Sequence, residues 1–234
     1  MSTQTYPQGK PKQLSFLTAT RVQQSFVAAA EKRTLAWLAE RTPRWINSDH
    51  LTLLGFVAQC LAGVCYALAR WNRYTLLLSI VFLALNWLGD SLDGTLARVR
   101  NCQRPRYGFY VDHIADTCAA FFLIGGLALS GYIRPAVAFG MLVAFLMLSI
   151  EAYLATYTLG QFQLSYWKFG PTEIRMLLAA GNLTLFRWPA ATVPHTQFRL
   201  LDFGGLIAMA GMALMFIASG ITHTRILYRE ERLS

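Results

Sequence analysis

Acidic residues are scarce in this chain: aspartate and glutamate together supply 12 of its 234 residues, and all charged residues make up only 14%. Hydrophobic residues make up 55%, which is more apolar surface than one soluble domain of this length needs to bury. The scarcity of charge therefore argues against an ordinary soluble domain. It predicts an integral membrane protein.

Cysteine is also rare, and the four cysteines fit neither a CxxC pair nor a zinc spacing, so we interpret them as small core residues. The net charge of +9 has no nucleic-acid-binding motif beside it, and nucleic acid is not an expected partner. The sequence contains no internal repeat and no second soluble domain. The first 44 residues lack an apolar run like that of a signal peptide, so we expect this segment to stay on the protein.

Long apolar runs predict six transmembrane helices and an all-α polytopic fold. The runs lack the strict alternation of a membrane β-barrel and are rich in Leu, Ala and Met. They lie near 51–69, 75–96, 107–131, 135–160, 172–188 and 201–222. The fifth run is diluted by Glu173, Arg175, Asn182 and Arg187, so five spans is the alternative.

The basic residues favour a cytoplasmic amino terminus, because that orientation places sixteen lysines and arginines on the cytoplasmic side and five on the other. We expect a cytoplasmic tail over 1–46, a transmembrane domain over 47–225 and a short cytoplasmic tail over 226–234. Within the first tail, 21–41 predicts an amphipathic helix on the membrane surface. A solvated or partner-packed helix is the alternative. The expected location is a membrane, the inner (cell) membrane in a bacterium.

Four of the six aspartates lie between residues 90 and 116, in the frame D-x2-D-G-x2-A-R-x9-G-x3-D-x3-D. Residues three or four apart share one face of a helix, so Asp90, Asp93 and Ala97 form one stripe. Gly108, Asp112 and Asp116 form a second stripe. Two such helices facing each other would bring four carboxylates together.

Four neighbouring carboxylates repel one another unless a positive group lies among them, and hard oxygen ligands suit Mg²⁺, Mn²⁺ or Ca²⁺. The frame therefore predicts a divalent metal site, with room for two ions. Carboxylates around two metals are typical of displacement at phosphorus. The orientation above places this site on the cytoplasmic side.

The Asp90–Asp116 frame resembles the signature of the CDP-alcohol phosphotransferase (CDP-alcohol phosphatidyltransferase) family at all eight of its positions. Asn47, Leu51, Thr52 and Gly55 are similar to the segment that opens the family's first membrane helix. The resemblance implies a phospholipid-synthesising enzyme that transfers a phosphatidyl or phosphoalcohol group from a CDP-linked donor to an alcohol and releases CMP. It also implies Mg²⁺ or Mn²⁺, two ions, as cofactor and a homodimer as the common assembly.

The resemblance assigns a role to each matching position. Asp90, Asp93 and Asp112 would hold the metal ions, with Asp116 as a shared ligand or the general base, and we choose Asp116 as the catalytic base. Thr52 and Arg98 would donate hydrogen bonds to the nucleotide or its phosphates. Asp93 would also lie beside the nucleotide. The small residues that would let the nucleotide approach are Gly94, Ala97 and Gly108.

The candidates for binding the alcohol acceptor are Glu151, Glu173 and Arg175. The alternative role for these residues is ion pairing between helices. A four-residue likeness of GPTE, residues 170–173, to family members that use amino alcohols favours an unphosphorylated alcohol. We expect CDP-diacylglycerol as the donor. A CDP-amino alcohol transferring to diacylglycerol is the alternative.

Two readings from other classes stay open. Carboxylates inside a membrane also suit a cation-binding transporter, although a transporter does not need the small residues and arginine of the frame. A non-catalytic scaffold is the other reading, although all four aspartates are present.

Overall fold

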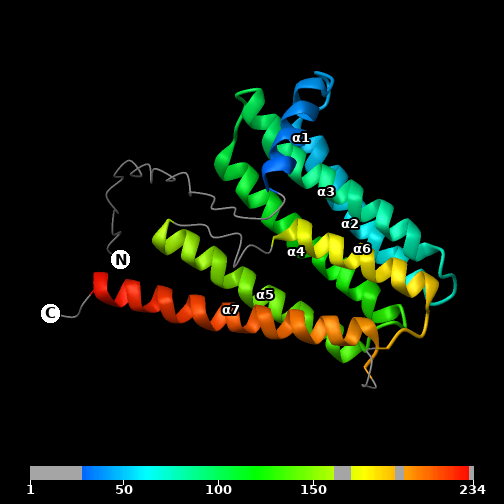
Figure 1. Ribbon diagram of the computed structural model, residues 1–234. Coiled ribbons are helices and arrows are strands. Elements are labelled where there is room, and N and C mark those ends of the chain that lie inside the picture. The colour runs from blue at the N-terminus through cyan, green and yellow to red at the C-terminus, as the bar shows by residue number, and fades with distance from the viewer. Residues whose placement is uncertain (1–27, 161–169, 193–197, 232–234) are drawn as a thin grey trace, which may run out of the picture.

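The computed structural model describes residues 28–160, 170–192 and 198–231, and these residues form seven α-helices and no strand (Figure 1). The helices are α1 (Ala28–Arg41), α2 (Ser48–Leu68), α3 (Thr75–Val99), α4 (Pro105–Leu129), α5 (Pro135–Leu159), α6 (Pro171–Arg187) and α7 (Leu200–Glu230). The predicted all-α fold is confirmed.

Local sequence signals explain where several of these helices begin and end. Pro105, Pro135 and Pro171 occupy the first turns of α4, α5 and α6, where a missing backbone N–H costs nothing. The α5 helix is terminated by Gly160, which follows its last residue and has a φ of 66° that glycine readily adopts.

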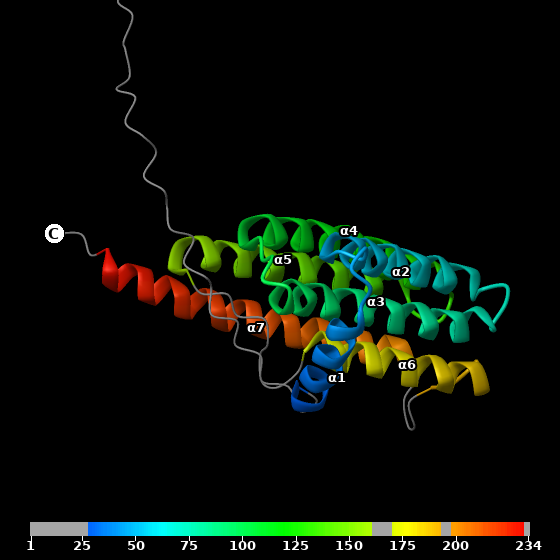
Figure 2. The ribbon, with the colours of Figure 1, turned by 90° about the horizontal axis from the view of Figure 1, so that it is seen from above.

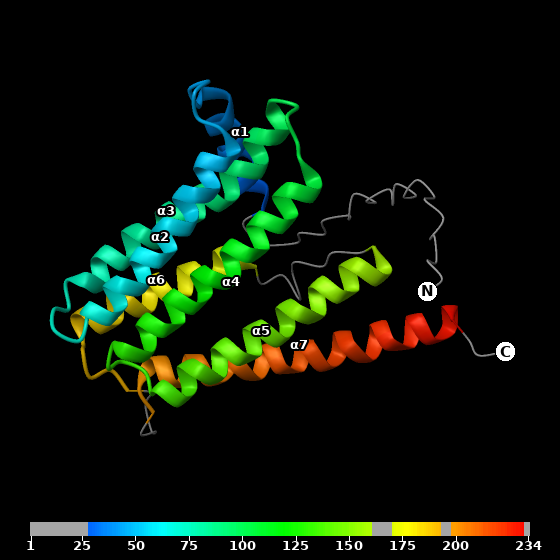
Figure 3. The same cartoon turned by 180° about the vertical axis from the view of Figure 1, so that it is seen from behind.

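The helices α2, α3 and α4 form the centre of the bundle, with α1 and α6 packed against α3. The α5 helix packs on α4 and on α7, and α5 and α7 lie side by side along one flank (Figure 2, Figure 3). The larger cluster of buried apolar residues gathers where α2 ends and α3 begins, and includes Tyr66, Leu76 and Leu127. This core holds the bundle together at the end opposite the aspartate motif.

Glycines bring α2 into backbone contact with both neighbours. A Cβ added at Gly89 of α3 would lie 2.6 Å from the backbone nitrogen of Gly55 and from the backbone oxygen of Leu51. A Cβ added at Gly126 of α4 would overlap the carbonyl group of Gly63. Small residues at these crossings let the helix backbones approach closely, as is typical in membranes.

The Gly126→Ala substitution should destabilise the bundle, because α2 and α4 must separate to accept the methyl group. Overpacking of this kind costs about 1–3 kcal/mol. Its matched control is Gly125→Ala, where a Cβ meets nothing within 4 Å and alanine favours the helix. Thermal unfolding in detergent should show a lower midpoint for Gly126→Ala and an unchanged or higher midpoint for Gly125→Ala. Equal midpoints would contradict the close α2–α4 contact.

Five of the predicted spans are confirmed as helices long and apolar enough to cross a membrane: α2, α3, α4, α5 and α7. The remaining predicted span, 172–188, coincides with α6, which has 17 residues and is not among these five helices. At 1.5 Å per residue this helix is about 25 Å long, shorter than a hydrocarbon core of about 30 Å. The structure therefore does not confirm six spans.

The path of α6 is nevertheless compatible with a sixth crossing. Its first half contacts Asp90 through Arg175, and its second half contacts Ser79 through Asn182, so α6 runs antiparallel to α3. The α7 helix then runs parallel to α5, because Asp202 lies beside Arg134 and His223 lies beside Glu151. The six-span arrangement stays a prediction.

The α1 helix covers the last two thirds of the predicted amphipathic segment, and residues 21–27 lie outside the described residues. Leu35 and Ala39 are buried in a cluster with Leu92 and Leu96 of α3. This packing corresponds to the partner-packed alternative, with the rest of the bundle as the partner. The location of α1 on a membrane surface stays a prediction.

Candidate active site

All four motif aspartates line one pocket between α2, α3 and α4. The aspartates of the two predicted stripes share it, with Asp90 and Asp93 on α3 and Asp112 and Asp116 on α4. The remaining lining residues are Thr52, Gly55, Phe56, Gln59, Asn86, Ala115 and Ala119. The pocket therefore joins the Asp90–Asp116 frame to the segment at the start of α2.

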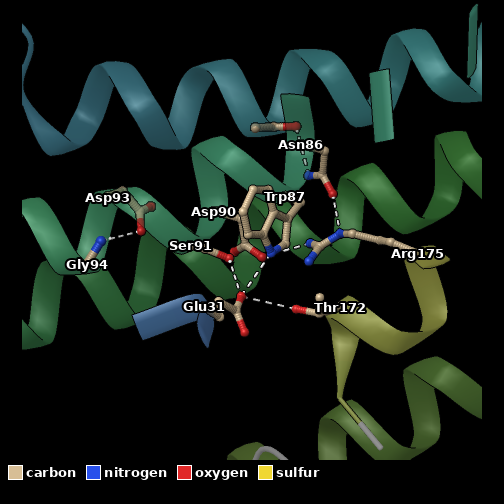
Figure 4. Close-up of polar contacts among 10 residues, drawn as sticks. Glu31, Asn86, Trp87, Asp90, Ser91, Asp93, Gly94, Thr172 and Arg175 are labelled. Carbon is tan, nitrogen blue, oxygen red and sulfur yellow. Dashed lines mark hydrogen bonds and ion pairs between the residues drawn. The ribbon is translucent and has the colours of Figure 1, made fainter. Parts of the chain in front are cut away.

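Asp93 is the buried carboxylate of this pocket, with 8% of its surface exposed. The hydroxyl of Thr52 donates to Oδ2 at 2.7 Å. The backbone N–H of Gly94 donates to Oδ1 (Figure 4). The Thr52 hydroxyl also lies 3.1 Å from the carbonyl oxygen of Ser48. These contacts fix the rotamer of Asp93 against the start of α2.

Asp90 forms an ion pair with α6. The Arg175 guanidinium donates from Nη2 to Asp90 Oδ2 at 2.7 Å and from Nε to Asn86 Oδ1 at 2.7 Å (Figure 4). Asn86 in turn donates from Nδ2 to the carbonyl oxygen of Gly55 at 3.0 Å. One chain of contacts therefore connects α6, α3 and α2 at the pocket.

The carboxylates fit a divalent cation by their chemistry. They supply hard oxygen donors to one pocket, and with Arg175 beside Asp90 they carry more negative charge than positive. Among the described side chains, however, no three acidic, histidine or cysteine residues are arranged as ligands of one ion. Asp90 is turned toward Arg175, and Asp93 toward Thr52 and Gly94. Metal binding would require these side chains to change partners or share them.

Two glycines of the frame border open space rather than packed neighbours. A Cβ at Gly108 would meet nothing within 4 Å, and a Cβ at Gly94 would meet only Arg98 Nη1, at 3.5 Å. Arg98 donates from Nη2 to Thr95 Oγ1 at 3.0 Å. Gly94 and Gly108 thus differ from Gly89, which is closed off by α2. Neither glycine, nor Ala97 or Arg98, lines the pocket itself.

Two of the predicted acceptor residues lie elsewhere. Glu151 of α5 is paired with His223 of α7, with Oε1 and Nδ1 2.6 Å apart. Glu173 accepts the backbone N–H of Gly170 at 2.9 Å and so caps α6. Neither lines the aspartate pocket, whereas Arg175 contacts two of its residues. Of the three candidates, only Arg175 is brought to the motif.

Sequence reasoning missed Asn86 and Glu31. Asn86 lies one helical turn before Asp90, and this spacing was a usable signal, because the two side chains share a face of α3. Glu31 lies on α1 and is bound by side chains of α3 and α6. Its partners are 56 and 141 residues away in the chain, so no local pattern marks it.

An α-helical bundle with five helices able to span a membrane, and with four aspartates around one polar pocket, defines a polytopic membrane protein with an acidic site. The family model for CDP-alcohol phosphatidyltransferase matches residues 45–223, which include the whole Asp90–Asp116 frame. The chain therefore belongs to the CDP-alcohol phosphatidyltransferase family.

The chain is also similar to a curated relative and to a solved structure. It is 31% identical over 104 residues to archaetidylinositol phosphate synthase of Pyrococcus horikoshii, covering 44% of this chain and 52% of that protein. The match thus spans about half the length of the relative. The crystal structure of Mycobacterium tuberculosis phosphatidylinositol phosphate synthase with CDP-DAG bound superposes with a TM-score of 0.53 at 21% identity. That match covers 84% of this chain and 92% of the other, and it shows a shared fold.

Proposed function

We propose that this protein transfers the phosphatidyl group of CDP-diacylglycerol to the hydroxyl of an alcohol, releasing CMP and forming a phosphodiester lipid. The observation that carries the proposal is the gathering of all four frame aspartates around one pocket in a chain of this family. The archaeal relative and the mycobacterial structure are both inositol phosphate lipid synthases, and the latter has CDP-DAG bound, which supports the same donor class.

The proposed step is an in-line displacement at the β-phosphorus of the donor. The acceptor oxygen forms a bond to this phosphorus, while the bond from the phosphorus to the bridging pyrophosphate oxygen breaks and CMP leaves with the electron pair. Asp116 accepts the proton of the acceptor hydroxyl, since its side chain is exposed at the pocket. Positioning of the two reactants supplies much of the acceleration.

Asp90, Asp93, Asp112 and Asp116 are the residues that would hold divalent cations, Mg²⁺ or Mn²⁺ and two in number. When bound, these ions supply positive charge to the pyrophosphate and to the departing CMP. The protein's own contribution is to orient the carboxylates, through Thr52 and Gly94 at Asp93 and through Arg175 at Asp90.

The donor nucleotide would lie along the open sides of Gly94 and Gly108, toward the cytoplasm. The absence of close neighbours at these glycines supports room for a ring or a phosphate there. Arg98 lies beside Gly94 and would supply a cationic donor to a phosphate oxygen. We further propose that the protein works as a homodimer, as the family resemblance implies.

We propose an acceptor without a phosphate group. Among the described residues that line the pocket there is no lysine or arginine. The nearby guanidinium of Arg175 is bound to Asn86 and Asp90, so a second phosphate would find little positive charge there.

Purified protein in detergent, given CDP-diacylglycerol, Mn²⁺ and a panel of alcohols, tests the reaction and the acceptor together. The panel contains serine, glycerol and inositol, beside glycerol phosphate and inositol phosphate, and lipid products are identified by mass spectrometry. We expect a phosphodiester lipid from one unphosphorylated alcohol. A product only from a phosphorylated alcohol would contradict the acceptor proposal. Parallel reactions offer CDP-choline or CDP-ethanolamine with diacylglycerol, and a product only from these reactions would contradict the proposed donor.

The Thr52→Val substitution should lower CMP release about tenfold or more, because it removes the side-chain donor to Asp93 while keeping the shape of the residue. Hydrogen bonds to charged groups contribute about 1.5–3 kcal/mol. Thr158→Val is the matched control, since the Thr158 hydroxyl donates to the carbonyl oxygen one turn earlier, on exposed α5 surface away from the pocket. Initial rates of CMP release for the two variants measure the difference. A Thr52→Val rate equal to that of Thr158→Val would refute the proposed role of Thr52.

A further inference from the structure

The α1 helix contributes a buried carboxylate to the region beside the pocket. Glu31 is 7% exposed, and its Oε1 accepts three hydrogen bonds. The donors are Trp87 Nε1 at 2.9 Å, Thr172 Oγ1 at 3.2 Å and Ser91 Oγ at 3.3 Å (Figure 4). One oxygen atom therefore connects α1 to both α3 and α6.

The positions of these donors relate them to the ion pair at the pocket. On α3, Ser91 directly follows Asp90, and Trp87 lies one turn before it. On α6, Thr172 lies in the first turn and Arg175 is three residues later, on the same face. Glu31 is thus hydrogen-bonded to residues near Asp90 on α3 and to a residue near Arg175 on α6.

The far half of α6 has an anchor of its own. Asn182 donates from Nδ2 to the Tyr66 hydroxyl at 2.8 Å and to the Ser79 hydroxyl at 2.8 Å. This anchor fixes the end of α6 that lies away from the motif. The first turn of α6, which carries Thr172, is attached to α3 through Glu31.

Burying a carboxylate costs desolvation free energy, which a purely structural contact does not require. Its three partners are neutral donors, and Oε2 is buried without a hydrogen-bond partner among the described residues. A side chain with this cost is more readily explained by a functional requirement for the geometry that it imposes.

We propose that Glu31 is a positioning residue for the active site. It holds the first turn of α6 against α3, and so keeps the Arg175 guanidinium on Asp90 and Asn86. The α1 helix is then part of the catalytic apparatus, beyond any role at a membrane surface. This inference rests on the proposed transfer reaction.

The test is a set of variants assayed for CMP release with saturating substrates. Glu31→Ala should lower kcat about tenfold to a hundredfold, since small misplacements of positioning groups have effects of this size. Glu31→Gln keeps an oxygen acceptor and should recover most of the loss. Thr172→Val removes only the α6 contact and should lower kcat several-fold, which keeps the test informative if Glu31→Ala folds poorly. Glu40→Ala, on the exposed side of the same helix, should leave kcat unchanged.

A double-mutant cycle with Arg175→Gln separates positioning from general stability. If Glu31 acts through Arg175, adding Glu31→Ala to Arg175→Gln should lower kcat little further. Asn182→Ala loosens the far anchor, so its fold-loss in kcat should instead multiply with that of Arg175→Gln in the double variant. Independent effects of Glu31→Ala and Arg175→Gln would overturn the proposal.

A readout without turnover distinguishes this inference from the proposed reaction. The indole N–H resonance of Trp87, assigned with Trp87→Phe in ¹H–¹⁵N spectra, should move in Glu31→Ala and move less in Glu31→Gln. An unmoved resonance would overturn the Glu31 contact whatever the activity. Absence of CMP release from wild-type protein, with the resonance moving as expected, would instead overturn the proposed reaction and with it the catalytic meaning of the contact.

Discussion

Replacing Asp93 by asparagine should lower metal-dependent CMP release about a thousandfold or more. The substitution keeps the size of the side chain but removes the charge that would bind a cation. It also places an amide N–H₂ where Thr52 or the backbone of Gly94 now donates. A metal ligand contributes several kcal/mol to charge stabilisation, and about 4 kcal/mol corresponds to a thousandfold change in rate.

Asp202→Asn is the matched control for Asp93→Asn. Asp202 is also a buried aspartate of a membrane helix, 1% exposed, but it lies at the far end of the bundle and accepts the backbone N–H of Arg134 at 2.6 Å. We expect Asp202→Asn to lower the thermal midpoint while the folded fraction keeps its kcat. If Asp93→Asn stays within tenfold of wild type, Asp93 is not a ligand in the reaction.

Replacing Asp116 by asparagine should lower kcat about a hundredfold to ten-thousandfold, the usual contribution of a general base. Asp116 differs from Asp93 in that its side chain is exposed at the pocket rather than buried against protein donors. A base needs such access, because it must meet the acceptor hydroxyl directly.

Metal affinity distinguishes the two aspartates. The concentration of Mn²⁺ that gives half-maximal CMP release should rise strongly in Asp93→Asn and only modestly in Asp116→Asn, whose main defect is in kcat. Manganese binding without turnover can be followed by the electron paramagnetic resonance signal of free Mn²⁺. Normal turnover of Asp116→Asn with intact metal binding would remove Asp116 from the role of base.

Sequence reasoning was most successful where local spacing decides the outcome. Apolar length located α2, α3, α4, α5 and α7, because the bilayer sets the number of residues that a crossing needs. Helical periodicity placed the four aspartates around one pocket, because residues three or four apart share a face. Length and hydropathy were ambiguous for α6, in which the polar side chains of Arg175 and Asn182 contact α3.

Contacts between distant helices could not be read from spacing. Glu151 faces His223 on α7, and Glu31 is bound from α3 and α6. Arg175 was expected at the acceptor and is found on Asp90. In each case the partner is set by how the helices pack, which depends on the whole bundle rather than on any one segment.

The proposed transfer is tested most directly by CMP release from CDP-diacylglycerol by the purified wild-type protein, measured with an alcohol acceptor before and after removal of divalent metal by chelation. We expect acceptor-dependent CMP release that stops on chelation and returns with Mg²⁺ or Mn²⁺. No release from any donor and acceptor pair, by folded protein supplied with metal, would contradict it and favour a cation transporter or a non-catalytic scaffold.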